Sequence, residues 1–274
     1  MLRPDLHLAT CRSLPDGDPD TRRLASHLRG QGLAVEVVVW DDPAVDWEAP
    51  GLTLIRSTWD YHERRDAFVR WVRSVPRLHN PAALVEWNTD KRYLIDLSAT
   101  LPVVESELLV DPTPRRVAGR MDALGLDEAV LKPTFGLDGH GVMRVGRDGV
   151  GPLPGAWLLQ PFVEEASREG ETSVVVIDGH PSHAVLRRPP PDDFRAQERL
   201  GGRVEAVDPE PDVSALALRA VQTLDPVPLY ARVDVVRRGG TPVIMELELV
   251  EPSLFFDHGP AGLDAMTRAL QARL

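Results

Sequence analysis

The 274-residue sequence contains one cysteine, Cys11, which excludes an intramolecular disulfide and a metal site built from several cysteines. It contains no apolar run that approaches the length of a membrane span, and its first twenty residues have no hydrophobic region typical of a secretion signal. Positive charge is scarce, with 31 Lys and Arg against 42 Asp and Glu and a net charge of −11. This balance argues against nucleic acid and anionic membranes as partners, so we expect a cytoplasmic protein.

The composition is compatible with folded domains and with an anionic small ligand. The length is enough for one large domain or for two to three small ones, and the hydrophobic content of 43% supports packed cores. The acidic net charge does not exclude a nucleotide, because a bound metal ion and a few local cations can reverse the local field.

The first eighty residues have the pattern of a small α/β unit with a parallel sheet. The predicted order is strand, helix, strand, strand, helix, at residues 6–10, 21–30, 33–40, 52–56 and 64–75. Asp20 is expected to cap the first helix. The pair Asn80-Pro81 marks a boundary.

Beyond this boundary the sequence predicts helices mixed with antiparallel strand pairs. Residues 172–177 and 182–188 are expected to pair around a turn, as are residues 231–236 and 242–249. Further strands are predicted at 129–132, 142–145 and 156–162, and helices at 89–97, 112–125, 213–224 and 265–274, the last capped by Asp264.

Three carboxylates late in the chain form the most informative set. Glu246 and Glu248 stand two residues apart on a predicted strand, so their side chains point to the same face, and Asp234 on the preceding strand can lie opposite them. Hard oxygen ligands of this kind suit Mg²⁺, especially where phosphate oxygens complete its coordination shell. A solvent-facing acidic strand is the alternative, but apolar residues flank the acids and Arg232 shares the face of Asp234. The set therefore predicts a magnesium site.

Two lysines and a glycine-rich segment indicate phosphate binding. Lys132 ends an apolar strand and precedes the segment TFGLDGHGV, in which Gly139 and Gly141 allow backbone N–H groups to approach phosphate oxygens. Lys91 stands at the start of a predicted helix. Taken alone, each lysine is better explained as a solvated side chain, Lys91 at a helix start and Lys132 at a strand end.

The segment LLQPFVEE, residues 158–165, is a candidate adenine site. Its strand-to-loop residues can offer backbone hydrogen bonds to an adenine edge, and the acid that follows can accept from ribose hydroxyls; these residues are Gln160, Pro161, Phe162, Val163 and Glu164. A buried strand that runs into an acidic loop is the equally good alternative.

Arginines form a fourth set. Arg187 and Arg188 close a predicted strand, and Arg195 lies in the proline-rich segment that follows. Guanidinium groups suit carboxylate and phosphate recognition, although in so acidic a chain they can equally pair with surface acids.

A fifth candidate site follows the predicted strand at 52–56, at the carboxyl end of the parallel sheet, where ligands of α/β folds collect. It consists of Ser57, Thr58, Trp59, Asp60 and Tyr61. Hydroxyls, a carboxylate and aromatic rings suit a small polar substrate. A helix-capping turn, with Asp60 as the cap and Trp59 as packing, is an equal alternative.

Taken in order, these elements resemble the ATP-grasp superfamily. The spacing of the acids, twelve residues and then two, is similar to the glutathione synthetase-like branch. The phrases STWDY, WNTDKRYLIDL, DFRAQERLGG and MELELVEPSLFF resemble a narrower group, the O-ureido-serine cyclo-ligases of cycloserine biosynthesis, over nearly the whole chain. One segment departs from that group: in TFGLDGHGV, Phe135 and His140 are bulkier than the serine- and alanine-rich loop associated with it.

The resemblance implies an α/β (α+β) fold of the ATP-grasp type. An N-terminal parallel α/β domain would span residues 1–86, a central lid region residues 87–165, and a C-terminal antiparallel-sheet domain residues 166–274, with ATP clamped between the last two. Several roles are also implied. Lys91 and Lys132 would contact ATP phosphates, residues 160–163 the adenine, Glu171 the ribose or lid, Arg187 and Arg232 the transferring phosphoryl group, and Asp234, Glu246 and Glu248 magnesium.

The implied activity is that of an ATP- and Mg²⁺-dependent ligase. It would join a small amino-acid-like carboxylate to a nitrogen through an acyl phosphate, between two molecules or within one. A small-molecule kinase on the same fold and a non-catalytic nucleotide-binding module remain as alternatives; the presence of all three carboxylates and both lysines weighs against the module. ATP and a small-molecule substrate are the expected partners, and the sequence leaves homodimerisation open.

Overall fold

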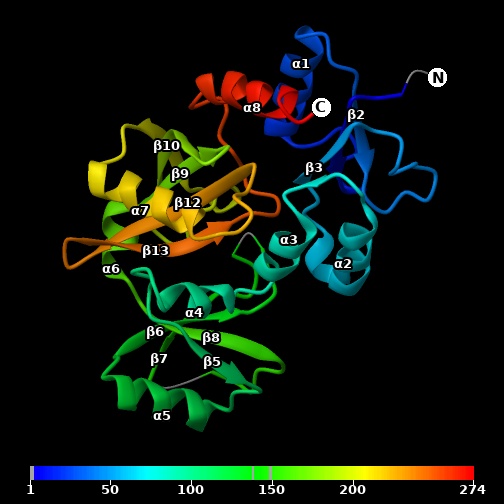
Figure 1. Cartoon of the computed structure of the whole chain (residues 1–274). Helices are drawn as coiled ribbons and strands as arrows, with labels where there is room; N and C mark the ends of the chain where they lie inside the picture. The colour runs from blue at the N-terminus through cyan, green and yellow to red at the C-terminus, as the bar shows by residue number, and fades with distance from the viewer. Residues whose placement is uncertain (1–2, 138, 148–149) are drawn as a thin grey trace.

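The computed structural model describes residues 3–137, 139–147 and 150–274 of the chain. Its strands form three sheets that lie around a common centre (Figure 1). The helices of the described residues include none with the length and hydropathy needed to cross a membrane.

The first sheet is parallel and has the strand order β2-β1-β3-β4. Its strands are β1 (Leu6–Thr10), β2 (Val35–Val39), β3 (Leu52–Ser57) and β4 (Leu78–His79), with helices α1 (Pro19–Gly30) and α2 (Arg65–Ser74) and the short 3₁₀ turn η1 (Tyr61–Arg64). The predicted parallel α/β unit is therefore confirmed. Cys11 is buried among the apolar side chains that α2 packs on this sheet.

The second sheet is antiparallel and lies at the opposite end of the molecule from α8 (Ala261–Gln271) (Figure 1). Its order is β5 (Glu107–Val110), β8 (Ala156–Pro161), β6 (Glu128–Pro133) and β7 (Met143–Gly146). Helix α5 (Pro114–Leu124) covers one face through Val117 and Met121. Strand β5 was not predicted from the sequence.

The third sheet is also antiparallel and forms the largest core. Its order is β11 (Arg203–Val207), β10 (His180–Arg188), β9 (Glu171–Ile177), β12 (Tyr230–Arg238) and β13 (Thr241–Glu248). Helix α7 (Pro211–Gln222) packs on it, α6 (Glu164–Glu169) contacts strands β10 and β12, and α8 contacts β9 and β10 and runs back to α1 (Figure 1). Both predicted strand pairs are confirmed, whereas β11 and α6 were not predicted.

The prediction of one helix over residues 89–97 is wrong. Two helices, α3 (Ala82–Asn88) and α4 (Tyr93–Ser98), flank a turn that contains Lys91. The Asp90 carboxylate accepts the backbone N–H of Arg92 at 3.0 Å, a local bond that competes with helix continuation. The Lys91 backbone N–H donates to the Thr134 carbonyl at 2.8 Å, so the turn is tied to the end of β6.

The two predicted helix caps are also wrong. Asp18, not Asp20, caps α1, because its carboxylate accepts the Thr21 backbone N–H at 3.0 Å and Pro19 occupies the first helical turn. Helix α8 begins at Ala261, so Asp264 lies inside its first turn, where an acid still interacts favourably with the helix dipole.

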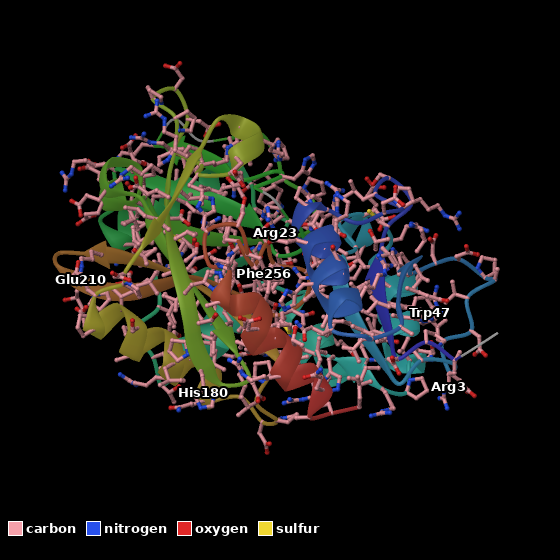
Figure 2. All side chains as sticks on the ribbon, turned by 90° about the horizontal axis from the view of Figure 1, so that it is seen from above. Arg3, Arg23, Trp47, His180, Glu210 and Phe256 are labelled. Carbon is pink, nitrogen blue, oxygen red and sulfur yellow. The ribbon has the colours of Figure 1, made fainter. Side chains whose placement is uncertain are left out.

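Asp20 instead joins α1 to the segment that follows β13. Its buried carboxylate accepts the backbone N–H groups of Leu254, Phe255 and Phe256 at 2.7, 2.8 and 3.0 Å. Phe256 lies where α8 and α1 come together (Figure 2). One carboxylate therefore fixes three consecutive residues between the first and third sheets.

We expect Asp20→Ala to lower the free energy of unfolding by on the order of 3 kcal/mol, because three buried N–H groups lose a charged acceptor. Chemical denaturation checks this value. Asp16→Ala, which removes an exposed acid in the loop that precedes α1, is the matched control and is expected to change stability little. Equal stability of the two variants would contradict the role of Asp20.

Candidate active site

A cavity of about 320 Å³ lies between the second and third sheets and reaches the loop after β3. This volume is typical of a small-molecule site. Most of the predicted site residues line it: Trp59, Tyr61, Lys91, Lys132, Gly139, Gln160, Pro161, Phe162, Val163, Glu171, Arg187, Arg195, Arg232, Glu246 and Glu248.

The three predicted metal ligands converge beside the cavity, where Glu246 and Glu248 line its wall and Asp234 is buried behind them. Asp234 on β12 lies opposite Glu246 on β13, and Arg232 lies opposite Glu248. One oxygen of each carboxylate lies within 4.8 Å of the others, and Asp234 is fully buried. The prediction that these carboxylates lie close together is confirmed. The donor set fits a hard divalent cation such as Mg²⁺, with room in the cavity for oxygens from a ligand.

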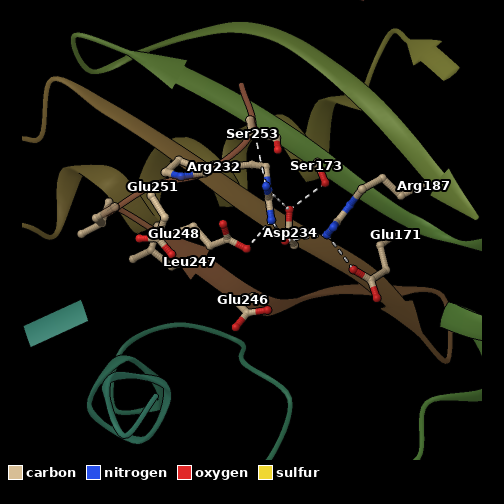
Figure 3. A network of polar contacts seen from close by, with 12 residues as sticks. Glu171, Ser173, Arg187, Arg232, Asp234, Glu246, Leu247, Glu248, Glu251 and Ser253 are labelled. Atoms are coloured by element: carbon tan, nitrogen blue, oxygen red, sulfur yellow. Dashed lines mark hydrogen bonds and ion pairs between the residues drawn. The ribbon is translucent and has the colours of Figure 1, made fainter. Parts of the chain in front are cut away.

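Two arginines balance the charge of the acids (Figure 3). Arg232 donates to Asp234 at 3.0 and 3.1 Å and also pairs with Glu248, while Arg187 pairs with Asp234 at 2.6 Å and with Glu171 at 2.9 Å. Burial opposes ionisation of Asp234, but Arg187 and Arg232 lower the pKa of this carboxyl to about 2. Burial raises the pKa of Glu248 to about 7. Cation binding would favour the ionised form of Glu248.

Both predicted phosphate-binding lysines lie in the cavity and not in open solvent. Lys91 forms an ion pair with Glu246, and the Lys132 side chain is buried with its Nζ 3.6 Å from the Met245 sulfur. Burial opposes the charge of Lys91, but Glu246 raises its pKa. For Lys132 burial prevails and lowers the pKa. Two ammonium groups therefore stand at the rim of the acid cluster, where phosphate oxygens would offset their charge.

The lysine content of the sequence is a further indication that these two residues are functional. Lys91 and Lys132 are the only lysines in the chain, whose other basic side chains are arginines and histidines. Because the chain uses no other lysine on its surface, the interpretation of Lys91 and Lys132 as ordinary solvated side chains is weakened.

The basic loop joins the site through Arg195. This guanidinium pairs with Asp193 at 2.7 Å and donates to the Gly139 carbonyl at 3.3 Å, so it connects the proline-rich segment to the glycine-rich one. Gly141 is exposed and does not line the cavity. Arg188, one residue after Arg187, points away from the site and pairs with Glu205 at the surface.

Four of the five residues of the candidate adenine segment line the cavity, and Glu164 does not. Pro161, Phe162 and Val163 lie along one wall, and buried Gln160 donates to the Ser106 hydroxyl at 2.8 Å. Glu164 is exposed at the start of α6 and is outside the cavity lining, so the structure does not bring it to the site.

Residues 57–61 were interpreted from the sequence either as a substrate site or as a structural turn, and the structure supports each interpretation for some of them. Trp59 and Tyr61 line the cavity. Ser57 is buried against Thr10 and Asp18, and Asp60 accepts hydrogen bonds from Trp40 and Arg64 without capping η1. Thr58 is buried and outside the lining. Only the two aromatic residues therefore face the cavity, and the hydrogen bonds of Ser57 and Asp60 hold the loop.

Several residues that hold β13 in place were not predicted from the sequence. Strand β13 is at the edge of its sheet, where backbone groups need other partners. Asn88 accepts from the Leu249 N–H at 2.7 Å and donates to the Leu247 carbonyl at 2.8 Å, and the Tyr93 hydroxyl accepts the Leu247 N–H at 3.1 Å. These bonds fix the register that sends Glu246 and Glu248 into the cavity. Asn88 and Tyr93 lie in the phrase WNTDKRYLIDL, which supplied the only hint.

Two family models match the chain. Residues 6–80 match the N-terminal domain of the D-cycloserine synthetase DcsG, and residues 138–254 match the RimK-like ATP-grasp domain. The second match includes the acids of β12 and β13 and the arginines that pair with them, whereas Lys91 and Lys132 precede the matched residues.

Individual proteins agree with these matches. The chain is 33% identical to the cycloserine biosynthesis protein DcsG of Streptomyces lavendulae over 94% of either sequence. It is 32% identical to the glutathione synthetase of Prochlorococcus marinus strain MIT 9313 over 48% of this chain and 43% of that protein. The crystal structure of D-cycloserine synthetase DcsG superposes with a TM-score of 0.85 at 31% identity, covering 98% of this chain and 99% of that one. The fold predicted from the sequence is confirmed.

Proposed function

This chain belongs to the ATP-grasp ligases, as a relative of DcsG, and we propose that it uses ATP and Mg²⁺ to close a small amino-acid-like molecule into a ring. The ring-forming bond would join the substrate's own carboxyl carbon to its own nitrogen. O-ureido-serine is the first candidate substrate. The observation that carries the proposal is the convergence of Asp234, Glu246 and Glu248 beside the cavity that both lysines of the chain line.

Each part of the cavity has a chemical task under this proposal. Asp234, Glu246 and Glu248 would hold the metal, which supplies charge neutralisation for the phosphates of ATP. Lys91 and Lys132 bind phosphate oxygens at the rim of the cluster. Residues 160–163 contact the adenine, and Gly139 approaches the phosphates from the glycine-rich segment, which Arg195 anchors.

The reaction then needs two steps. The substrate carboxylate attacks the γ-phosphorus of ATP, which gives an acyl phosphate and ADP, and Arg187 and Arg232 stabilise the negative charge of the transferring group. The substrate nitrogen attacks the acyl carbon and phosphate leaves. A closed cavity protects the acyl phosphate from water. No protein nucleophile is required.

Product analysis tests the proposal. The protein is incubated with ATP, Mg²⁺ and O-ureido-serine or related amino-acid derivatives, and ADP, phosphate and the organic product are measured. Release of ADP with stoichiometric phosphate and a cyclic amide-type product is expected. A stable phosphorylated product would instead identify a kinase, and absence of turnover with every substrate would identify a binding module.

The division of the chain into residues 1–86, 87–165 and 166–274 is part of the same proposal. The segment from Leu84 to Val103 shares its apolar core with the third sheet, and the second sheet begins with β5 at Glu107 and ends with β8 at Pro161. A movement of the second sheet over the cavity would therefore hinge between Val104 and Glu107, and again near Val163.

A further inference from the structure

One acid in the cavity has no task in the reaction described above. Glu251 lines the cavity three residues beyond Glu248 and is not part of the group that converges on the metal site. In Figure 3 it lies next to Glu248, at the end of the polar network away from Glu171. Its Oε2 atom is buried and has no hydrogen-bond partner among the described residues.

Two of the nearby cations are engaged elsewhere. Lys91 pairs with Glu246, and Arg232 pairs with Asp234 and Glu248. The third, Arg56, is buried, donates from Nη2 to the Pro252 carbonyl at 2.9 Å and lies 5.3 Å from the centre of the Tyr230 ring, and its Nε and Nη1 atoms have no hydrogen-bond partner among the described residues. Within the described parts of the chain, Glu251 forms no ion pair with any of them.

Two aromatic side chains border the same corner of the cavity. The Trp59 indole N–H donates to the Glu251 backbone carbonyl at 3.4 Å, and Trp59 and Tyr61 both line the cavity. Burial, followed by the charge of Glu251, raises the pKa of the Tyr61 hydroxyl well above its usual value. A carboxylate bordered by aromatic rings is an arrangement that suits a cationic ligand group.

We propose that Glu251 binds the ammonium group of a zwitterionic amino-acid substrate. The inference rests on the proposed function, which brings the substrate carboxylate to the acid cluster. In an α-amino acid a single carbon separates the ammonium and carboxylate groups, so an ammonium group beside Glu251 leaves its carboxylate near Arg232 and the metal ligands. A substrate ammonium supplies the positive partner that Oε2 lacks, with Trp59 and Tyr61 adding cation–π attraction.

The charge state of Glu251 is consistent with this role. Burial, and then the neighbouring charge of Glu248, raise the pKa of Glu251 to about 8. A buried carboxylate without a matched cation resists ionisation, and a bound ammonium group removes that penalty.

The test compares O-ureido-serine with its des-amino analogue, in which hydrogen replaces the ammonium group. Steady-state turnover is measured for the wild type and for Glu251→Gln, Glu251→Asp and Glu169→Gln, the last as a matched control on an exposed acid outside the cavity lining. The wild type and the control are expected to prefer the amino substrate by about a hundredfold in kcat/KM, as is typical when a buried polar partner is lost. Glu251→Gln is expected to reduce this preference to a few-fold, mainly through KM, with the KM for ATP unchanged. Glu251→Asp is expected to retain part of it.

A preference that survives in Glu251→Gln would overturn the proposal. An equal loss for both substrates, or a raised Mg²⁺ requirement, would also overturn it, because either would show a structural or metal-binding role. Calorimetric titration of the same two compounds into each protein, with Mg²⁺ and a non-hydrolysable ATP analogue, gives the preference without turnover. If the preference is seen in binding but no product forms, the ammonium site stands and the ligase reaction fails.

Discussion

Replacing Glu246 by alanine is expected to abolish Mg²⁺-dependent ADP formation while leaving the protein folded. Glu246 faces Asp234 across the β12–β13 pair and is also the ion-pair partner of Lys91. Its loss removes one of three metal ligands and releases the ammonium group that it positions. Charge stabilisation by a metal ion is worth several kcal/mol, so the loss in kcat/KM is expected to reach about a thousandfold or more.

Two controls make this result interpretable. Glu169→Ala removes an exposed acid outside the cavity and is expected to retain wild-type turnover. Thermal unfolding and circular dichroism of Glu246→Ala establish that the variant is folded. Turnover within a few-fold of the wild type would remove Glu246 from the metal site.

Lys132→Ala is expected to weaken ATP binding about ten- to a hundredfold. The lysine is buried in the cavity, beside Met245 and within the field of Glu246. A hydrogen bond from a charged donor to phosphate is worth about 1.5–3 kcal/mol, and each 1.4 kcal/mol is roughly a factor of ten in Kd.

Calorimetry with ATP and Mg²⁺ measures this effect. Arg147→Ala provides the control, because Arg147 pairs only with surface acids among the described residues and lies outside the cavity lining. An unchanged Kd for Lys132→Ala would show that the buried ammonium group serves the fold and not the nucleotide.

Much of the architecture could be predicted because local patterns are strong there. The apolar runs of β1, β2 and β3 with their intervening helix specify a parallel unit, and turns rich in glycine define the later hairpins. Strands β5 and β11 lacked such signals. Strand β5 has an exposed terminal valine, Val110, and β11 alternates arginine and glutamate with small apolar residues at a sheet edge. Their pairing depends on neighbours distant in sequence.

The acids of the site could be predicted because a hairpin relates Asp234, Glu246 and Glu248 through strand periodicity alone. Asp20 and Glu251 could not. Asp20 is in the first turn of a helix, a common place for a cap, and its partners are more than 230 residues away. Glu251 follows the strand that carries the metal ligands, and only the cavity shows that it faces a ligand.

The corrections at Lys91 and in the loop after β3 have a shared physical origin. Asp90 bonds to the Arg92 backbone and Ser57 bonds to Thr10 and to the Asp18 N–H, so short polar side chains satisfy the nearby backbone and set the loop shape. Side chains of the same types also bind ligands, and the sequence pattern alone does not show whether such a residue bonds to the nearby backbone or to a ligand.

The acyl phosphate is the central claim, and transfer of ¹⁸O tests it most directly. The substrate is labelled with ¹⁸O in its carboxylate and incubated with the protein, ATP and Mg²⁺, and the released phosphate is analysed by mass spectrometry. If the carboxylate attacks the γ-phosphorus, one labelled oxygen leaves with the phosphate, and each turnover gives one singly labelled phosphate and one cyclic product. Unlabelled phosphate formed together with that product would contradict the account.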